Sequence, residues 1–132
     1  MPTASSVGVS ILAFLVLDGL WLGVLMKDFY VRQFGPIGRI VDGGFAPIWW
    51  AAAVVYVLLG IGVAALAVPR ATSLTGAIAH GALFGLVVYG VYDLTNYSTL
   101  AQWPAIVTAA DIAWGTIACA TVAAIVFSVS SR

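Results

Sequence analysis

Four long apolar runs dominate the chain, separated by shorter stretches that carry most of the polar residues. The runs cover roughly residues 7–26, 47–68, 74–97 and 103–129, and a helix needs about 20 mostly apolar residues to cross a membrane. The strands of a membrane β-barrel would instead alternate apolar and polar positions, which these runs do not do. We therefore expect an all-α integral membrane protein with four spans in one domain, residues 1–132.

The connections between the runs predict how the helices are arranged. One connection is long and polar, residues 27–46, and it contains the helix-breaking pair Gly43–Gly44. The other two are short turns near Pro69 and Pro104. Short connections place consecutive helices side by side, so we expect a four-helix bundle with antiparallel neighbours. Because Asp18 interrupts the first run, we expect a retained span and not a cleaved signal peptide.

The composition supports a membrane protein and excludes several other classes. Hydrophobic residues make up 63% of the chain and charged residues 8%, whereas soluble domains carry roughly 25% charged residues. A soluble globular enzyme, a disordered chain and a nucleic-acid binder are therefore excluded. The single cysteine, Cys119, lies in an apolar run without metal-ligand spacing. Three of the five basic residues lie in the long connection, which favours the cytoplasmic side for it.

Three aspartates lie inside the apolar runs, and they are the strongest candidates for function. Asp18, Asp93 and Asp111 each cost about 2.5–3.5 kcal/mol at the centre of a spanning helix, so a functional role is the first hypothesis. With a helical rise of about 1.5 Å per residue, all three lie roughly 6–12 Å from the membrane face that carries the long connection. We expect them to form one layer beneath that face.

Aromatic and amide side chains share helical faces with these aspartates. Helices repeat about every 3.6 residues, so residues three or four apart lie on one side. In the third run Gly81 and Gly85 lead into this stripe, and their spacing permits close contact with another helix. Tyr56 of the second run lies at a similar depth. The predicted ligand-binding residues are Asp18, Trp21, Tyr89, Tyr92, Asp93, Asn96, Asp111 and Trp114.

Other conspicuous side chains have simpler interpretations. His80 lies roughly 20 Å along the helix from Asp93 and points away from the stripe, so we expect a packing or interfacial role for it. Trp49, Trp50 and Trp103 lie near the ends of runs, where aromatic belts occur in membrane proteins. The spacing of the aspartates does not favour a metal site, and the sequence leaves the cofactor unknown because it contains no nucleotide-binding motif.

Three classes of function fit these observations. The first is a site for a lipid-like or small amphipathic molecule, which the protein uses either to carry the molecule or to help modify it. The second is a structural accessory subunit of a larger respiratory or photosynthetic membrane complex, with the aspartates as hydrogen-bonding groups between helices. The third is a membrane-embedded enzyme that uses an aspartate as general acid or base. The expected partners are membrane lipids, a larger complex or a second copy of the chain, and no nucleic acid.

Four ordered motifs carry a resemblance to a known family. They are Leu17–Gly23, Lys27–Tyr30, Tyr89–Asn96 and Asp111–Gly115. With these motifs the chain resembles a family of small bacterial predicted membrane proteins, domain of unknown function 2177, over nearly its whole length. The resemblance implies a four-helix, multi-pass protein of the bacterial inner membrane. It implies no established activity and no catalytic residues.

Overall fold

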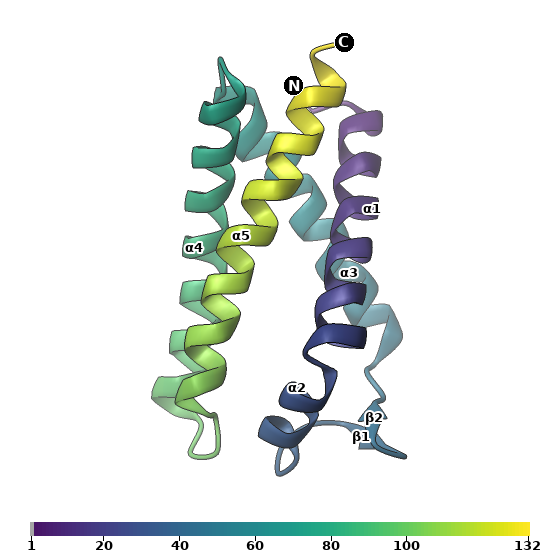
Figure 1. Cartoon of the computed structure of the whole chain (residues 1–132), viewed down its shortest axis with the longest axis vertical. Helices are drawn as coiled ribbons and strands as arrows, with labels where there is room; N and C mark the ends of the chain where they lie inside the picture. Colours follow the sequence, from purple (N-terminus) through teal and green to yellow (C-terminus); the bar gives the residue numbers. More distant parts are fainter. Residues whose placement is uncertain (1) are drawn as a thin grey trace.

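The computed structural model describes residues 2–132 and forms a bundle of four long helical segments (Figure 1). Each segment is long and apolar enough to cross a membrane: Ala4–Leu25, Trp49–Arg70, Leu74–Thr99 and Ala105–Ser130. Both chain ends lie at one end of the bundle, and the long connection lies at the other. The predicted four-helix membrane bundle is confirmed, and the chain is a multi-pass membrane protein.

The elements follow one another along the chain with few irregular residues. In order they are α1 (Ala4–Leu20), η1 (Trp21–Leu25), α2 (Lys27–Phe34), β1 (Ile40–Val41), β2 (Gly44–Phe45), α3 (Trp49–Gly62), η2 (Val63–Ala67), η3 (Val68–Arg70), α4 (Leu74–Thr99) and α5 (Ala105–Ser130). The segments η1 and η2 are π-helical, and η3 is a 3₁₀ turn. Wider π-helical turns are frequent at functional sites, and η1 begins three residues after Asp18.

Helix α1 begins at Ala4, a few residues before the start that hydropathy predicts, because polar residues cap it. The Thr3 hydroxyl accepts a hydrogen bond from the Ser6 backbone N–H at 3.0 Å, and the Ser6 hydroxyl accepts one from the Thr3 N–H at 2.9 Å. This capping box satisfies two N–H groups that lack partners within the helix. Ser73 caps α4 by accepting from the Gly76 N–H at 3.0 Å.

The connection between α1 and α3 contains secondary structure that the hydrophobic pattern did not predict. Helix α2 follows Met26, and the strands β1 and β2 pair as an antiparallel hairpin. The hairpin turn is formed by Asp42 and Gly43, whose φ angles are 51° and 77°. Two consecutive residues with positive φ form the type I′ turn that matches the twist of paired strands, and Asp-Gly is a favoured sequence for it. The connection is therefore an ordered cap on this end of the bundle.

Helices α4 and α5 form the tightest pair because glycines bring their backbones together. A Cβ atom at Gly81 would lie 2.5 Å from the carbonyl oxygen of Cys119, and one at Gly85 would collide with the backbone of Gly115. The Tyr89 ring packs in turn against Gly115. The close contact that the spacing of Gly81 and Gly85 predicted is thus confirmed, and it explains why small residues occur there.

The α3 segment lies against α4 at the end of the bundle that holds the termini and separates from it toward the long connection. The core residues Phe14, Val63 and Val122 are fully buried in its middle. Helix α3 packs against α1, whereas α4 approaches the α3 segment mainly through η2 and η3, starting where Phe84 contacts Gly62. Figure 1 shows α3 crossing diagonally behind the other helices, near α4 at one end and near α1 at the other. The α3–α4 side is therefore open near the long connection.

Candidate functional site

Asp18 lies on the inner face of α1 with a donor on each carboxylate oxygen. Its side chain is buried, with 7% exposure. Trp114 of α5 donates its indole N–H to Oδ1 at 2.7 Å, and Tyr56 of α3 donates its hydroxyl to Oδ2 at 2.9 Å. Hydrogen bonds to a charged acceptor are shorter and stronger than neutral ones. Asp18 therefore joins three helices at one point.

Asp111 of α5 receives its hydrogen bond from the cap. The Tyr30 hydroxyl of α2 donates to Asp111 Oδ1 at 3.1 Å and accepts from the Trp21 indole N–H at 3.2 Å. Burial raises the pKa of the Tyr30 hydroxyl, the Trp21 N–H opposes this shift, and the Asp111 carboxylate adds to it. Tyr30 therefore remains a hydrogen-bond donor at neutral pH and fastens α2 to the bundle.

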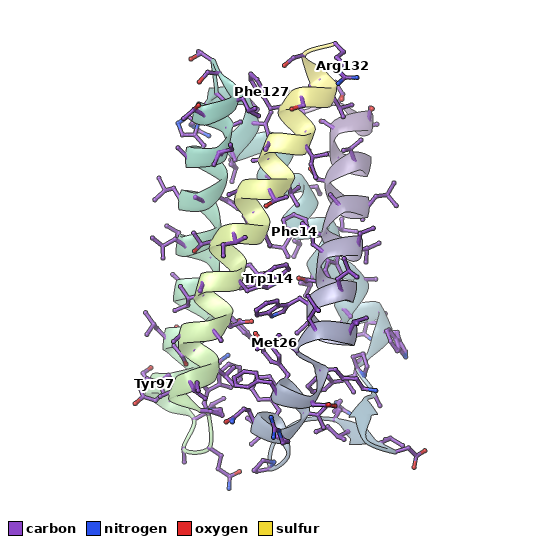
Figure 2. All side chains as sticks on the ribbon, in the orientation of Figure 1. Phe14, Met26, Tyr97, Trp114, Phe127 and Arg132 are labelled. Carbon is purple, nitrogen blue, oxygen red and sulfur yellow. The ribbon has the colours of Figure 1, made fainter. Side chains whose placement is uncertain are left out.

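Two stacked tryptophans connect these two hydrogen-bonded groups. The rings of Trp21 and Trp114 lie with centroids 4.5 Å apart and planes 2° from parallel. Figure 2 shows Trp114 inside the bundle, between the levels of Phe14 and Met26. The sequence pairs each tryptophan with the aspartate on its own helix. The hydrogen bonds are crossed instead: Trp114 reaches Asp18 directly, and Trp21 reaches the second aspartate through a tyrosine.

Asp93 of α4 differs from the other two aspartates because no donor satisfies it. The side chain is fully buried, and among the described residues neither carboxylate oxygen has a hydrogen-bond partner. Its carboxyl group interacts with that of Asp111. Two carboxyl groups form a hydrogen bond with each other only when one of them holds a proton. The pair is therefore suited to hold one proton between two acids.

Two adjoining cavities begin at this level of the bundle. The inner cavity measures about 350 Å³ and the outer cavity about 760 Å³. The inner walls come from all four long segments and include Asp18, Val88, Tyr89 and Trp114. Five residues line both cavities, so the two are continuous: Leu22, Val55, Tyr56, Tyr92 and Asp111.

The outer cavity extends from Asp111 toward the cap. It is lined by Tyr30 and Phe34 of α2, by Arg39, and by residues at the start of α3. Trp103 lines it as well, packing against Phe34 with ring centroids 5.0 Å apart. Most of the wall is aromatic or aliphatic, and Arg39 supplies its basic group.

The predicted site residues separate into three groups in the structure. The first group lines the cavities and consists of Asp18, Tyr89, Tyr92, Asp111 and Trp114. Trp21 stacks on Trp114 and donates its indole N–H to Tyr30, so it holds this group in place. Asp93 contacts this group at Asp111 without lining either cavity. Asn96, one turn further along α4, is half-buried and lines neither cavity.

Sequence reasoning missed two hydrogen-bond donors and one aromatic wall. The sequence predicts a loop around Tyr30 and places Tyr56 only at a similar depth, although both residues donate to the aspartates. The sequence predicts an aromatic-belt position for Trp103, but its ring packs against Phe34, lines the outer cavity and donates its N–H to the Thr108 hydroxyl at 3.1 Å. Trp49 and Trp50, by contrast, are each 74% exposed at the start of α3.

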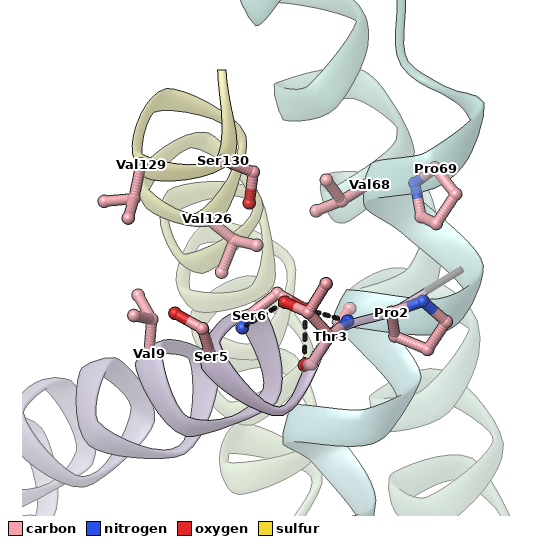
Figure 3. A pocket seen from close by; sticks show the side chains of 11 residues that line it. Pro2, Thr3, Ser5, Ser6, Val9, Val68, Pro69, Val126, Val129 and Ser130 are labelled. Carbon is pink, nitrogen blue, oxygen red and sulfur yellow. Dashed lines mark hydrogen bonds between the residues drawn. The ribbon is translucent and has the colours of Figure 1, made fainter. Parts of the chain in front are cut away.

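A third cavity lies at the other end of the bundle, beside the chain termini (Figure 3). It measures about 460 Å³, and its polar lining consists of hydroxyl-bearing residues such as Ser5, Ser130 and the α1 capping pair. His80 of α4 is half-buried, and its buried Nδ1 has no hydrogen-bond partner among the described residues. Within residues 2–132, no cluster of three His, Cys, Asp or Glu side chains could hold a metal ion.

Comparison with known proteins identifies the family. A family model described as a predicted membrane protein, DUF2177, matches residues 4–128. The match spans nearly the whole chain, so the protein belongs to this family, as the motifs around the three aspartates suggested. No curated protein and no solved structure matches the chain.

Proposed function

We propose that this multi-pass protein of the bacterial inner membrane binds a lipid-like or small amphipathic molecule. The polar part of the molecule sits among Asp18, Asp111 and their tyrosine and tryptophan partners. Its apolar part lies along the opening between α3 and α4. The protein uses the site either to carry the molecule or to present it for chemical modification.

The splay of α3 from α4 is the observation that carries this proposal. A ligand site inside a membrane bundle needs a way in, and the α3 segment meets α4 mainly beyond Gly62. Val55 of α3 and Val88 of α4 line the inner cavity and are partly exposed, so the cavity is open toward the position of the lipid tails. Small-molecule sites are largely apolar cavities of about 300–1,000 Å³ with a few placed polar groups, which matches both cavities.

The hydrogen-bonded aspartates make the site more than a gap in packing. Asp18 and Asp111 are held by donors from α2, α3 and α5, so their positions are set before a ligand arrives. Fixed polar groups in an apolar cavity give orientation and specificity at a low cost in conformational entropy. An ordinary contact between lipid-facing helices has no need of such a group.

Two substitutions on one helix test the proposal. Val88→Trp fills the inner cavity, whereas Val91→Trp adds the same bulk at a 65% exposed position that lines neither cavity. Both proteins are released from their own membrane with a mild detergent and weighed by native mass spectrometry. We expect a retained small mass on the wild type and on Val91→Trp, and its loss from Val88→Trp.

Other results would contradict the proposal in distinct ways. Equal retention by the two variants would place the bound molecule outside the cavity. Retained protein chains without a small molecule would favour the accessory-subunit hypothesis, in which the aspartates only join helices. Release of a chemically altered molecule on incubation would favour the enzyme hypothesis.

A further inference from the structure

The charges around the cavities point to the kind of polar group that the ligand carries. We propose that this group is a cation, such as the ammonium of an alkylamine, and that it enters in exchange for a proton held by the pair Asp93 and Asp111. The inference rests on the proposed function, and it adds the chemical class of the ligand and the ion that leaves.

The carboxyl groups of the site have no basic partner at their own level. The donors to Asp18 and Asp111 are tyrosine hydroxyls and an indole N–H, none of which carries a positive charge. Arg39 lines only the outer cavity. The other lysine and arginine residues lie beyond the spans or at their ends: Lys27, Arg32, Arg70 and Arg132. His80 lies within α4, 13 residues before Asp93 in the chain, and lines neither cavity. Buried carboxylates in a membrane are neutralised by a bound cation or by protons.

The unsatisfied side chain of Asp93 identifies where the proton is held. It is fully buried, no donor reaches it within the described residues, and it faces Asp111. One proton shared by the two acids gives each carboxyl group a hydrogen bond. Asp111 also lines both cavities, so a cation that arrives there meets one member of the pair directly.

The exchange balances in charge and atoms. Without ligand, one acid of the pair is protonated and the other is ionised. An alkylammonium that binds at Asp111 supplies one positive charge, and the shared proton leaves to water through the outer cavity. Asp93 and Asp111 are then both ionised, with the ammonium beside Asp111 in the cavity, so the net charge of the site is the same before and after binding. No bond other than that to the proton is broken.

Several titratable groups surround this pair and belong to the same site. Asp18 of α1 faces Asp111, as does Tyr30 of α2, and the inner cavity places Tyr56 of α3 beside them. Helix α4 contributes Tyr89 and Tyr92. Tyr30 and Tyr56 donate to the aspartates, and a tyrosine hydroxyl is uncharged at neutral pH, so the proton that responds to a cation belongs to the carboxyl groups.

The shape of the cavities fits a cation with an apolar tail. The rings of Tyr56, Tyr89 and Trp114 line the inner cavity beside the carboxylates. Aromatic faces attract cations by about 0.5–2 kcal/mol, most strongly where water is excluded. Arg39 repels a cation at the outer end, which favours the deeper position among the aspartates. The tail then lies along Val55 and Val88 toward the lipid.

Three probes with one chain length and different charges test the proposal. Dodecylammonium, dodecanol and dodecanoate are titrated by calorimetry into the full-length protein in nanodiscs of phosphatidylcholine, with empty nanodiscs as the reference. We expect dodecylammonium to bind at least about tenfold more tightly than the other two probes. Repeating its titration in two buffers of different ionisation enthalpy should report release of about one proton per amine bound.

Variants connect the released proton to the aspartates. Asp93→Asn keeps a hydrogen bond to Asp111 through its amide and removes the shared acid, so we expect binding without proton release. Asp28→Asn changes an exposed carboxylate on α2 and should behave as the wild type.

Equal or tighter binding of dodecanol or dodecanoate would overturn the proposal that the ligand is a cation, while leaving the proposed function in place. Binding of the amine without proton release in the wild type would overturn the exchange. Binding of none of the probes, together with no retained molecule in native mass spectrometry, would overturn both proposals.

Discussion

The indole N–H of Trp114 on α5 donates to Oδ1 of Asp18 on α1 across 2.7 Å. The two residues lie 96 positions apart in the chain, so the bond fastens the first helix to the last. With the Tyr56 hydroxyl on the other oxygen, it holds a carboxylate at the inner end of the cavity. The site and the stability of the bundle therefore depend on the same contacts.

Replacing Trp114 with Phe keeps most of the ring and removes the donor. We expect unfolding in detergent micelles to become easier by about 1–3 kcal/mol, because a buried acceptor loses its partner. Trp50→Phe, at a 74% exposed position, should change the unfolding free energy little. In a double-mutant cycle with Asp18→Asn, additive losses would show that the two side chains do not interact.

The contact between α4 and α5 should be sensitive to a single methyl group. Gly85→Ala places a Cβ against the backbone of Gly115, which cannot move aside without separating the helices. Gly90→Ala on the same helix meets no atom within 4 Å. We expect Gly85→Ala to lower the midpoint of thermal unfolding clearly, whereas Gly90→Ala leaves it unchanged or raises it slightly. Similar midpoints for the two variants would contradict the close packing.

Loss of the Tyr30 hydroxyl proton should weaken the attachment of the cap at alkaline pH. An unfolded tyrosine loses its proton near pH 10, whereas burial raises the pKa of Tyr30 in the folded protein. The stability that this residue contributes is therefore complete below about pH 10 and is lost as the pH rises further. Tyr30→Phe should show a shallower loss of stability above pH 10 than the wild type does.

A matched variant separates this effect from the general action of alkali. Tyr97→Phe removes a tyrosine that is 52% exposed on α4. Its unfolding free energy should follow that of the wild type across the alkaline range. If Tyr30→Phe follows the same curve as Tyr97→Phe, the buried hydroxyl contributes nothing to the pH dependence.

The hairpin turn should tolerate little change at Gly43. Its φ of 77° lies in the left-handed region, where a Cβ is unfavourable although no neighbouring atom would obstruct it. We expect Gly43→Ala to destabilise the hairpin by about 1 kcal/mol and to speed proteolysis within residues 35–48. A Cβ at Gly23 would also meet no atom within 4 Å, and the φ of Gly23 is not positive. Gly23→Ala should therefore leave the rate of proteolysis within residues 35–48 unchanged.

The sequence predicted the features that depend on one helix at a time. Hydropathy alone identified four spans, and counting residues along antiparallel helices placed Asp18, Asp93 and Asp111 at one level. Both inferences need only the rise of a helix and the thickness of a membrane. The glycine spacing of α4 was informative for a similar reason, because a small-residue stripe identifies a contact face without identifying the partner.

The features that the sequence did not predict depend on how helices rotate and tilt against each other. Trp114 shares a face with Asp111 on α5, yet its indole extends across to Asp18 on α1. Tyr30 reaches Asp111 only because α1 continues through the π-helical η1 and α2 folds back beneath the bundle. The opening between α3 and α4 cannot be predicted from hydropathy, because residues that face lipid and residues that face an apolar cavity are equally hydrophobic.

Photocrosslinking in intact membranes tests the lipid-side cavity most directly. A benzophenone amino acid replaces Val88, which lines the inner cavity, or Val91, which lies outside it on the same helix. After irradiation, mass spectrometry identifies the molecules attached at each position. We predict one strongly enriched amphipathic species at position 88 and the mixed lipids of the bulk membrane at position 91. The same mixture at both positions would contradict a selective site between α3 and α4.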